Sequence, residues 1–242
     1  MRQLDAPKAF VLARTDRLLV VAPHPDDDIL GCGALVAAAR ACRAPVDVVF
    51  LTGGEASHAP TADRPTHVLR AARAHEAIAA LDLLGVAASN VRHLQLPDGT
   101  LARLAPEAAS VATETLARIV DDVAPTIALV PWRRDPHPDH RAGSAFARDA
   151  VACFQRARDV RVLEYVVWLD ERGDARDRPQ PSEAREFRFA YDTSIAARKR
   201  AAILAHRSQT VDAPGVGFAL PATMIARACD GVETYYEVRD VA

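Results

Sequence analysis

The sequence predicts an α/β protein whose mainly parallel sheet is covered by helices on both faces. Short apolar runs alternate along the chain with longer segments of helical spacing, which is the pattern of βαβ units. The runs are apolar at successive positions, as expected of parallel strands buried on both faces. The chain has 242 residues, 50% of them hydrophobic. We therefore expect one domain, with a core over about 17–168 and a C-terminal extension with extra strands over about 169–242.

The core is expected to contain alternating strands and helices. Arg17–Ala22 and Val46–Thr52 are continuous apolar runs, and the Ala-rich segment Ile29–Arg43 between them has helical spacing. Gly85 is a stop signal for the second helix. Further strands are expected at Val91–Leu96, Thr126–Pro131 and Val160–Trp168, and further helices at Thr66–Leu84, Pro106–Val123 and Arg141–Arg156. Helices that join parallel strands make right-handed crossovers.

The chain after Trp168 has a different composition. Asp170–Arg185 is charged and contains two prolines, so we expect an exposed loop and a candidate lid. Val211–Thr223 is interrupted by Gly and Pro and predicts irregular structure. The other expected elements are an edge strand at Phe187–Tyr191, a helix at Ser194–Arg207 with Ser194 as its N-cap, and a last strand at Glu233–Val238.

Composition and charge narrow the class of partner and the compartment. A net charge of −2 gives no basis for nucleic acid or an anionic membrane as the main partner. No apolar run approaches the roughly 18 residues of a spanning helix, and the first residues lack the apolar centre of a signal peptide. We therefore expect a cytoplasmic protein without stable membrane insertion. The four cysteines are scattered, which argues against a disulfide framework or a Cys-based zinc site.

Two clusters of His and Asp directly follow predicted strands. The first is His24-Pro25-Asp26-Asp27-Asp28 and the second is His137-Pro138-Asp139-His140. Because parallel strands end at the same edge of a sheet, the two clusters can meet. Two imidazoles and one carboxylate form the three-ligand set of catalytic zinc sites, although the same donors also hold Fe²⁺ in oxygenases. The spare carboxylate of Asp26 suits a general base acting on metal-bound water, which favours zinc hydrolysis over iron chemistry.

These residues resemble the motifs of the PIG-L/LmbE-type zinc-dependent N-acetylglucosaminyl deacetylases. Pro23–Asp28 is similar to the first family motif, with Asp28 in place of the usual Glu, and His137–His140 is similar to the second. Weaker matches follow in the family's order at Thr52–Glu55, Arg73 with Glu76, Leu96–Gly99 and His206–Gln209. The resemblance implies a Rossmann-like fold and the removal of acetyl groups from N-acetylglucosamine conjugates.

The resemblance also implies roles for individual residues. The zinc ligands would be His24, Asp27 and His140, and Asp26 would be the general base. His137 would act as electrophile or acid at the amide, oriented by Asp139, and Arg73 and Asp98 would contact the substrate. Their positions alone add Glu55, at a strand end, and the pair Arg133 and Arg134, which could bind a substrate phosphate or carboxylate or be solvated surface residues.

The function expected from the sequence is zinc-dependent hydrolysis of the N-acetyl group of an N-acetylglucosamine-type sugar conjugate. Metal-bound water would be the nucleophile, and the substrate would be a small molecule or glycoconjugate. Three alternatives are an amidase acting on a related sugar–thiol conjugate, a non-haem Fe²⁺ oxidase and a catalytically inactive sugar-binding protein. The presence of both Asp26 and His137 argues against the last, since a binding protein needs neither.

Overall fold

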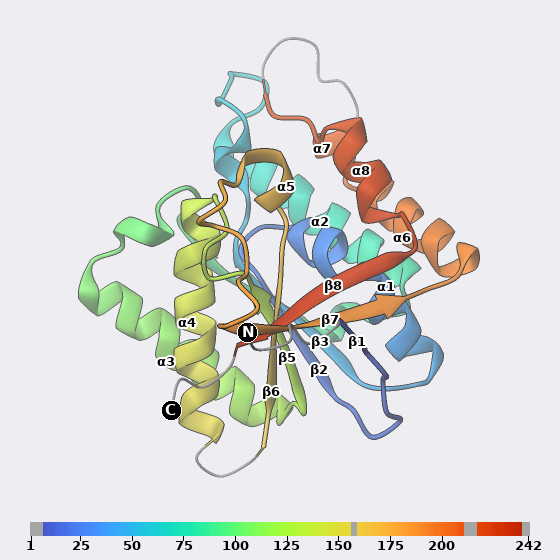
Figure 1. Cartoon of the computed structure of the whole chain (residues 1–242). Coiled ribbons are helices and arrows are strands. Elements are labelled where there is room, and N and C mark those ends of the chain that lie inside the picture. Colours follow the sequence, from blue (N-terminus) through green and yellow to red (C-terminus); the bar gives the residue numbers. More distant parts are fainter. Residues whose placement is uncertain (1–6, 156–158, 211–216, 239–242) are drawn as a thin grey trace.

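One mixed sheet with helices on both faces organises the molecule (Figure 1). The computed structural model describes residues 7–155, 159–210 and 217–238. Within these residues the sheet has eight strands in the order β1-β7-β8-β6-β5-β2-β3-β4. In the same part of the chain, no helix combines the length and apolar character needed to cross a membrane.

Five parallel strands form the centre of the sheet. They are β2 (Leu18–Ala22), β3 (Val46–Thr52), β4 (Val91–Leu96), β5 (Ile127–Pro131) and β6 (Arg161–Tyr165). β2 pairs with both β3 and β5, so the direction in which successive strands are added reverses between β2 and β5. This is the Rossmann-like order, in which a crevice forms at the carboxyl ends of the two strands flanking the reversal.

Helices pack on both faces, as the sequence predicts. α1 (Asp27–Ala41), α2 (Thr66–Leu83) and α6 (Thr193–Ala205) cover one face, and α3 (Pro106–Val123) and α4 (Pro138–Gln155) cover the other. Side chains alternate between the two cores along each strand, so that Val20 enters one core and Val21 the other. Both faces of β2 are therefore apolar, which explains its uninterrupted apolar run.

The C-terminal extension adds the antiparallel strands β7 (Ala184–Ala190) and β8 (Val232–Val238). β8 also pairs with β6, and β7 pairs with the two-residue strand β1 (Lys8–Ala9). The expected edge strand at Phe187–Tyr191 thus begins earlier and is not at the edge, because β1 covers it. Three short helices, α5 (Leu169–Arg172), α7 (Arg207–Thr210) and α8 (Ala222–Ala228), complete the extension. Residues 211–216 of the expected irregular segment lie outside the described residues.

Three helices begin at residues other than those expected. α1 begins at Asp27 rather than Ile29, because the N–H groups of Ile29 and Leu30 donate to the carbonyl of Asp26. α4 begins at Pro138 rather than Arg141, since proline fits the first turn of a helix. The N-cap of α6 is Asp192 rather than Ser194. Its carboxylate accepts hydrogen bonds from the backbone N–H groups of Ser194 and Ile195.

Candidate active site

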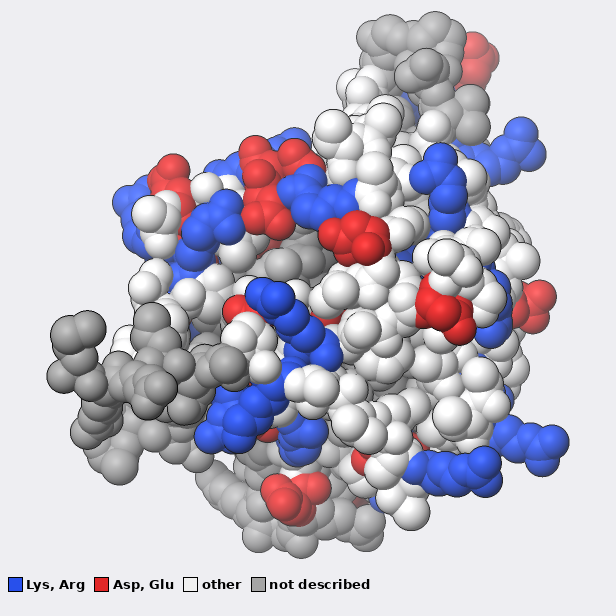
Figure 2. Space-filling model, turned by 45° about the vertical axis from the view of Figure 1, so that its right-hand side comes forward, with Lys and Arg blue, Asp and Glu red and all other residues white. Residues whose placement is uncertain are grey.

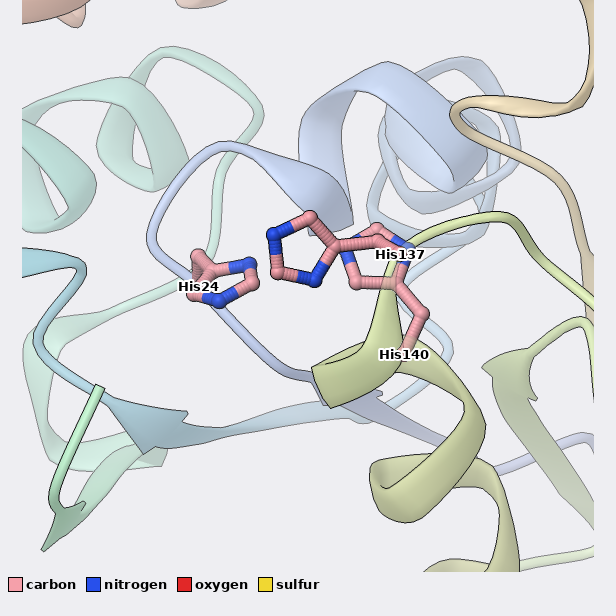
Figure 3. Close-up of side chains that lie close together, drawn as sticks. All are labelled: His24, His137 and His140. Atoms are coloured by element: carbon pink, nitrogen blue, oxygen red, sulfur yellow. The ribbon is translucent and has the colours of Figure 1, made fainter. Parts of the chain in front are cut away.

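The two His/Asp clusters meet at the carboxyl ends of β2 and β5. His24 lies on the loop between β2 and α1. His137 comes just before α4 and His140 lies in its first turn, and the rings of both lie next to that of His24 (Figure 3). The ring centroids of His24 and His137 are 4.9 Å apart, and those of His24 and His140 are 5.3 Å apart. Parallel strand ends therefore bring together residues that are more than a hundred positions apart in the sequence.

Asp27 joins the imidazoles of His24 and His140. Its Oδ2 atom lies 3.0 Å from Nδ1 of His24 and 3.2 Å from Nε2 of His140. The same oxygen accepts a hydrogen bond of 2.9 Å from the backbone N–H of His24. Two imidazole nitrogens and a carboxylate oxygen thus converge on one buried point.

This donor set fits a divalent metal ion. His140 is fully buried, yet neither of its ring nitrogens has a well-aligned hydrogen-bond partner. Buried polar atoms without partners are uncommon in proteins, and in a cluster of imidazoles and carboxylates a bound cation would satisfy them. Nitrogen donors of His24, His137 and His140 lie within 4.8 Å of one another, as do donors of His24, Asp98 and Asp139. Imidazole and carboxylate donors in such numbers suit zinc and also iron.

Proton affinities in the cluster follow from burial and from the neighbouring charges. Burial would lower the pKa of His140, but Asp27 and Asp135 raise it to about 9. Burial likewise opposes the charge of Asp27, but His140 and His24 hold its pKa well below the ordinary value. The site therefore holds positive charge beside the Asp27 carboxylate, and a metal ion would bind there by displacing the protons of the two histidines.

Asp26 has a strained backbone at the start of α1. Its φ of 138° lies in a region that residues other than glycine rarely adopt. Arg73 holds both the backbone and the carboxylate of this segment. Its guanidinium donates to the carbonyls of Pro25 and Gly54, and Nη2 lies 3.2 Å from Oδ2 of Asp26. Gly54 has a φ of 68°, and a Cβ there would lie only 2.2 Å from Arg73, so only glycine allows this approach. Burial raises the pKa of Asp26 to about 7 although Arg73 opposes the shift.

Asp98 and Asp139 both face the imidazole of His24. Nε2 of His24 lies 3.0 Å from Oδ1 of Asp98 and 3.4 Å from Oδ2 of Asp139. The Asp139 carboxylate also accepts hydrogen bonds from the backbone of Gly99 and Leu101. The sequence suggests that Asp139 orients His137 and that Asp98 contacts substrate. The structure places both carboxylates where they orient His24.

His137 is a neutral imidazole in this arrangement. Burial and the neighbouring charges of His140 and His24 lower its pKa to about 4. The backbone N–H of Asp139 donates to Nδ1 of His137 over 3.2 Å, which assigns the ring proton to Nε2. His137 can therefore act as a neutral hydrogen-bond donor, and this geometry favours the electrophile role over that of an acid.

A cavity of about 200 Å³ opens above these groups. His24, Asp26, Asp27 and His137 form its floor. The walls come from the loops after β3, β4 and β6, from α2 and from the C-terminal extension, including α5 and α7. Their lining residues are Ala56, Ser57, Arg73, Asp98, Gly99, Trp168, Arg172, Gln209 and Phe218. Of the substrate contacts suggested by the sequence, Arg73 and Asp98 line this cavity.

Three other suggested substrate contacts are engaged in ion pairs. Glu55 pairs with Arg70, Arg133 pairs with the buried Glu164, and Arg134 pairs with Glu183. None of Glu55, Arg133 and Arg134 is among the described residues that line the cavity. Arg133 and Arg134 lie just after β5, but a carboxylate on β6 and one on the segment before β7 form ion pairs with them.

Asp135 is a functional candidate that we did not identify in the sequence. It is fully buried, and its Oδ1 lies 3.2 Å from Nδ1 of His140. It also accepts hydrogen bonds from the backbone of His137, Val167 and Trp168. Asp135 thus connects the proposed metal ligand His140 to the cavity wall at Trp168. Its position two residues before His137 is visible in the sequence, but its partners on the segment after β6 are not.

Comparison with known proteins identifies related chains. The profile of the family described as PIG-L, GlcNAc-PI de-N-acetylase, matches residues 19–151, which is more than half of the chain. The matched segment contains both His/Asp clusters. No curated protein matches the chain significantly.

Solved structures share the fold over nearly the whole chain. A conserved protein from Thermus thermophilus is 26% identical with a TM-score of 0.64, over 94% of this chain and 96% of that one. The N,N′-diacetylchitobiose deacetylase from Pyrococcus horikoshii is 23% identical with a TM-score of 0.62, over 81% of this chain and 72% of that one. The deacetylase of the A40926 pseudoaglycone is 24% identical with a TM-score of 0.67, over 95% of this chain and 99% of that one. The α/β fold is thus shared with deacetylases.

Proposed function

Since the chain belongs to the PIG-L family of de-N-acetylases, we propose that it is a zinc-dependent hydrolase that removes the N-acetyl group from an N-acetylglucosamine-type sugar conjugate. The observation that carries the proposal is the position of Asp26, a buried carboxylate on strained backbone in the floor of the cavity and next to the His/Asp cluster. Residues with strained backbone are concentrated at functional sites, where the surrounding structure holds them in that conformation.

We assign zinc to His24, Asp27 and His140. The support is the convergence of their donor atoms on Asp27 Oδ2 and the lack of a well-aligned hydrogen-bond partner for either ring nitrogen of His140. Zinc, when bound, lowers the pKa of water toward neutrality and polarises an acyl oxygen. Asp98 and Asp139 hold the ring of His24 in place from its other nitrogen, as partners of ligating histidines commonly do.

The chain's own side chains then move the proton and stabilise charge. Asp26 accepts a proton from water as the water oxygen bonds to the carbonyl carbon of the acetamide. The N–H of His137 donates to the carbonyl oxygen as negative charge develops there. When the carbon–nitrogen bond breaks, Asp26 returns the proton to the nitrogen, and the products are acetate and the free amine. Arg73 keeps Asp26 in place throughout.

The experiment is to measure acetate release from a panel of N-acetylglucosamine conjugates by the zinc-loaded protein. We expect release, and we expect Asp26→Asn to retain zinc while losing about 10²- to 10⁴-fold in rate, the typical contribution of a general base. Asp28→Asn is the matched control. Asp28 is also a buried carboxylate, two residues after Asp26, but it does not line the cavity, so this variant should keep most of its turnover.

Two results would contradict the proposal. One is the absence of acetate release by the zinc-bound protein, and the other is an equal rate for wild type and Asp26→Asn. Oxygen uptake by the iron-loaded protein would then support the oxidase alternative. The conjugate with the highest rate identifies the group attached to the sugar, including a thiol-bearing one.

A further inference from the structure

The outer wall of the cavity, defined here as Trp168, Arg172 and Phe218, has no role in the proposed chemistry. The rings of Trp168 and Phe218 meet edge to face with centroids 5.4 Å apart. The guanidinium carbon of Arg172 lies 4.2 Å from the centroid of the Trp168 ring. Trp168 is the last residue of the core and the other two belong to the C-terminal extension, and all three line the same cavity as Asp26.

Arg172 carries a positive charge without an acidic partner. The carboxylates on its own short helix α5 are occupied, because Asp170 pairs with Arg178 and Arg227, and Glu171 pairs with Arg227. Within residues 7–155, 159–210 and 217–238, no carboxylate forms an ion pair with Arg172. Figure 2 shows Lys and Arg side chains spread over this face together with Asp and Glu side chains, so no single sign of charge covers it.

Stacking fixes this arginine without using its hydrogen-bond donors. A guanidinium that lies over an aromatic ring is held by its face, and its N–H groups point outward in the plane. Trp168 is itself held, since its backbone N–H donates to Asp135 over 3.0 Å. Arg172 is an exposed residue, but stacking on Trp168 holds its guanidinium at the cavity, where its N–H groups can donate to a ligand.

We propose that Arg172 binds an oxyanion, a phosphate or a carboxylate, on the part of the substrate beyond the N-acetylated sugar. This inference rests on the proposed deacetylase function, which places the acetamide on the floor beside Asp26. Planar bidentate donors match the geometry of both anions. Because the proposed reaction places the acetamide beside Asp26, an anion held by Arg172 orients the substrate with its amide toward Asp26. The preferred substrate is thus an anionic glycoside.

Three glycosides that differ only in the group on the anomeric oxygen provide the test. They are the neutral methyl glycoside of N-acetylglucosamine, the 1-phosphate and the carboxymethyl glycoside. We expect the zinc-loaded wild-type protein to prefer one or both anionic probes in kcat/KM. Arg172→Gln should reduce that preference by about tenfold or more, mainly through KM, because the contact is made equally in the ground and transition states. The phosphate and carboxymethyl arms identify which oxyanion the site takes.

Two variants control for charge and for shape. Arg176→Gln removes the same charge from another exposed arginine near α5, which pairs with Asp174 and does not line the cavity, and should leave the preference unchanged. Arg172→Lys keeps the charge but loses the planar fork, so it should retain part of the preference. An equal preference in Arg172→Gln and wild type would overturn the inference, including the case in which the phosphate binds at the metal instead.

Calorimetry separates this inference from the proposed function. Glucosamine 1-phosphate lacks the acetyl group and reports binding alone. If wild type hydrolyses none of the probes but binds this sugar phosphate about tenfold more tightly than Arg172→Gln does, the deacetylase proposal fails and the anion site stands. If the probes are hydrolysed and binding is the same in both proteins, the deacetylase proposal stands and the anion site is refuted.

Discussion

Two groups of buried charged side chains contact helix α1, and they differ in how far the protein satisfies them. The catalytic cluster, defined as His24, Asp26, Asp27, His137 and His140, lies at the N-terminus of α1. It brings carboxylates and imidazoles into close contact, with Arg73 beside Asp26. The ring nitrogens of His140 have no aligned partner, and Asp26 has strained backbone.

The second group, which we name the α1 clamp, consists of Lys199, Glu233 and Tyr235. Oε1 of Glu233 accepts hydrogen bonds of 2.7 Å from Nζ of Lys199 and from the backbone N–H of Ala34. Oε2 accepts from the backbone N–H of Leu35 at 2.9 Å and from the Tyr235 hydroxyl at 2.7 Å. Each carboxylate oxygen therefore has two donors, and one of the four donors is a positive charge.

Burial of charge is therefore not in itself a sign of function in this molecule. Apart from the half-buried His137 both groups are buried, but of the two only the catalytic cluster leaves polar atoms without an aligned hydrogen-bond partner. Unsatisfied atoms are costly, so they persist where a ligand completes them or where the surrounding structure enforces them. Substitutions in the cluster should affect metal binding and turnover, whereas substitutions in the clamp should affect the free energy of unfolding.

The largest effect is expected for His140→Ala, which removes a proposed metal ligand. Two of three ligands cannot hold zinc as tightly, so zinc content and acetate release should both collapse, with a rate loss on the order of 10³-fold or more. Elemental analysis and the acetate assay measure the two effects. His206→Gln is the matched control: His206 is also buried with both ring nitrogens unpartnered, but it does not line the cavity, so this variant should retain zinc. Full zinc occupancy in His140→Ala would refute the ligand assignment.

The clamp should show the reverse behaviour. Lys199→Met leaves the Glu233 carboxylate buried without its positive partner, which should lower the free energy of unfolding by about 3–5 kcal/mol. Urea unfolding measures the loss, and the folded variant should still bind zinc. Replacing both partners, as in Lys199→Met with Glu233→Leu, should recover part of the stability because no uncompensated charge remains. A loss below about 1 kcal/mol in the single variant would mean that the clamp does not stabilise α1.

The contrast also explains which parts of the fold the sequence predicts. The central strands are buried on both faces, so their apolar runs predict them to within a few residues at each end. Strand β1 has two exposed residues and carries no such pattern. It forms only because β7 offers it hydrogen bonds, and for that reason the sequence pattern wrongly predicts β7 as an edge.

The residues of the catalytic cluster lie close together within two short motifs that follow strands, so their spacing in the sequence is sufficient to find them. Proximity in sequence is misleading for Arg133, because strand pairing of β5 with β6 brings the buried Glu164 against it. The outer wall at Arg172 and Phe218 is assembled by tertiary packing of the extension, for which no local pattern exists.

Asp135 tests whether the cluster depends on partners outside it. Its carboxylate lies 3.2 Å from Nδ1 of His140 and also holds the backbone of His137 and Trp168. Asp135→Asn keeps the size of the side chain but weakens this support, and zinc affinity should fall about 10- to 100-fold. Competition with a chelator of known affinity measures it. A purely structural role would lower the stability of the protein and leave the zinc affinity of the folded form unchanged.

The smallest effect concerns His206, a buried histidine that the proposed chemistry does not use. Its exposed fraction is 1%, and burial, followed by the charge of Arg73, lowers its pKa to about 3. In the unfolded chain the pKa returns to about 6.5, so the unfolded state binds a proton first as the pH falls. The stability due to neutral His206 is complete above about pH 6.5 and is lost progressively below it, down to the folded-state pKa.

The expected loss between about pH 7.5 and about pH 5.5 is about 1.4 kcal/mol of unfolding free energy from this one group. Other groups of the site titrate in the same range, so the measurement is a difference: urea unfolding of wild type and of His206→Gln at both pH values. Glutamine cannot take up the proton, and the remaining groups are common to both proteins, so the subtraction isolates His206. Identical pH dependence in the two proteins would mean that His206 takes up its proton in the folded state at the same pH as in the unfolded chain. An imidazolium buried there would need an acidic partner, and among the described residues no carboxylate pairs with His206.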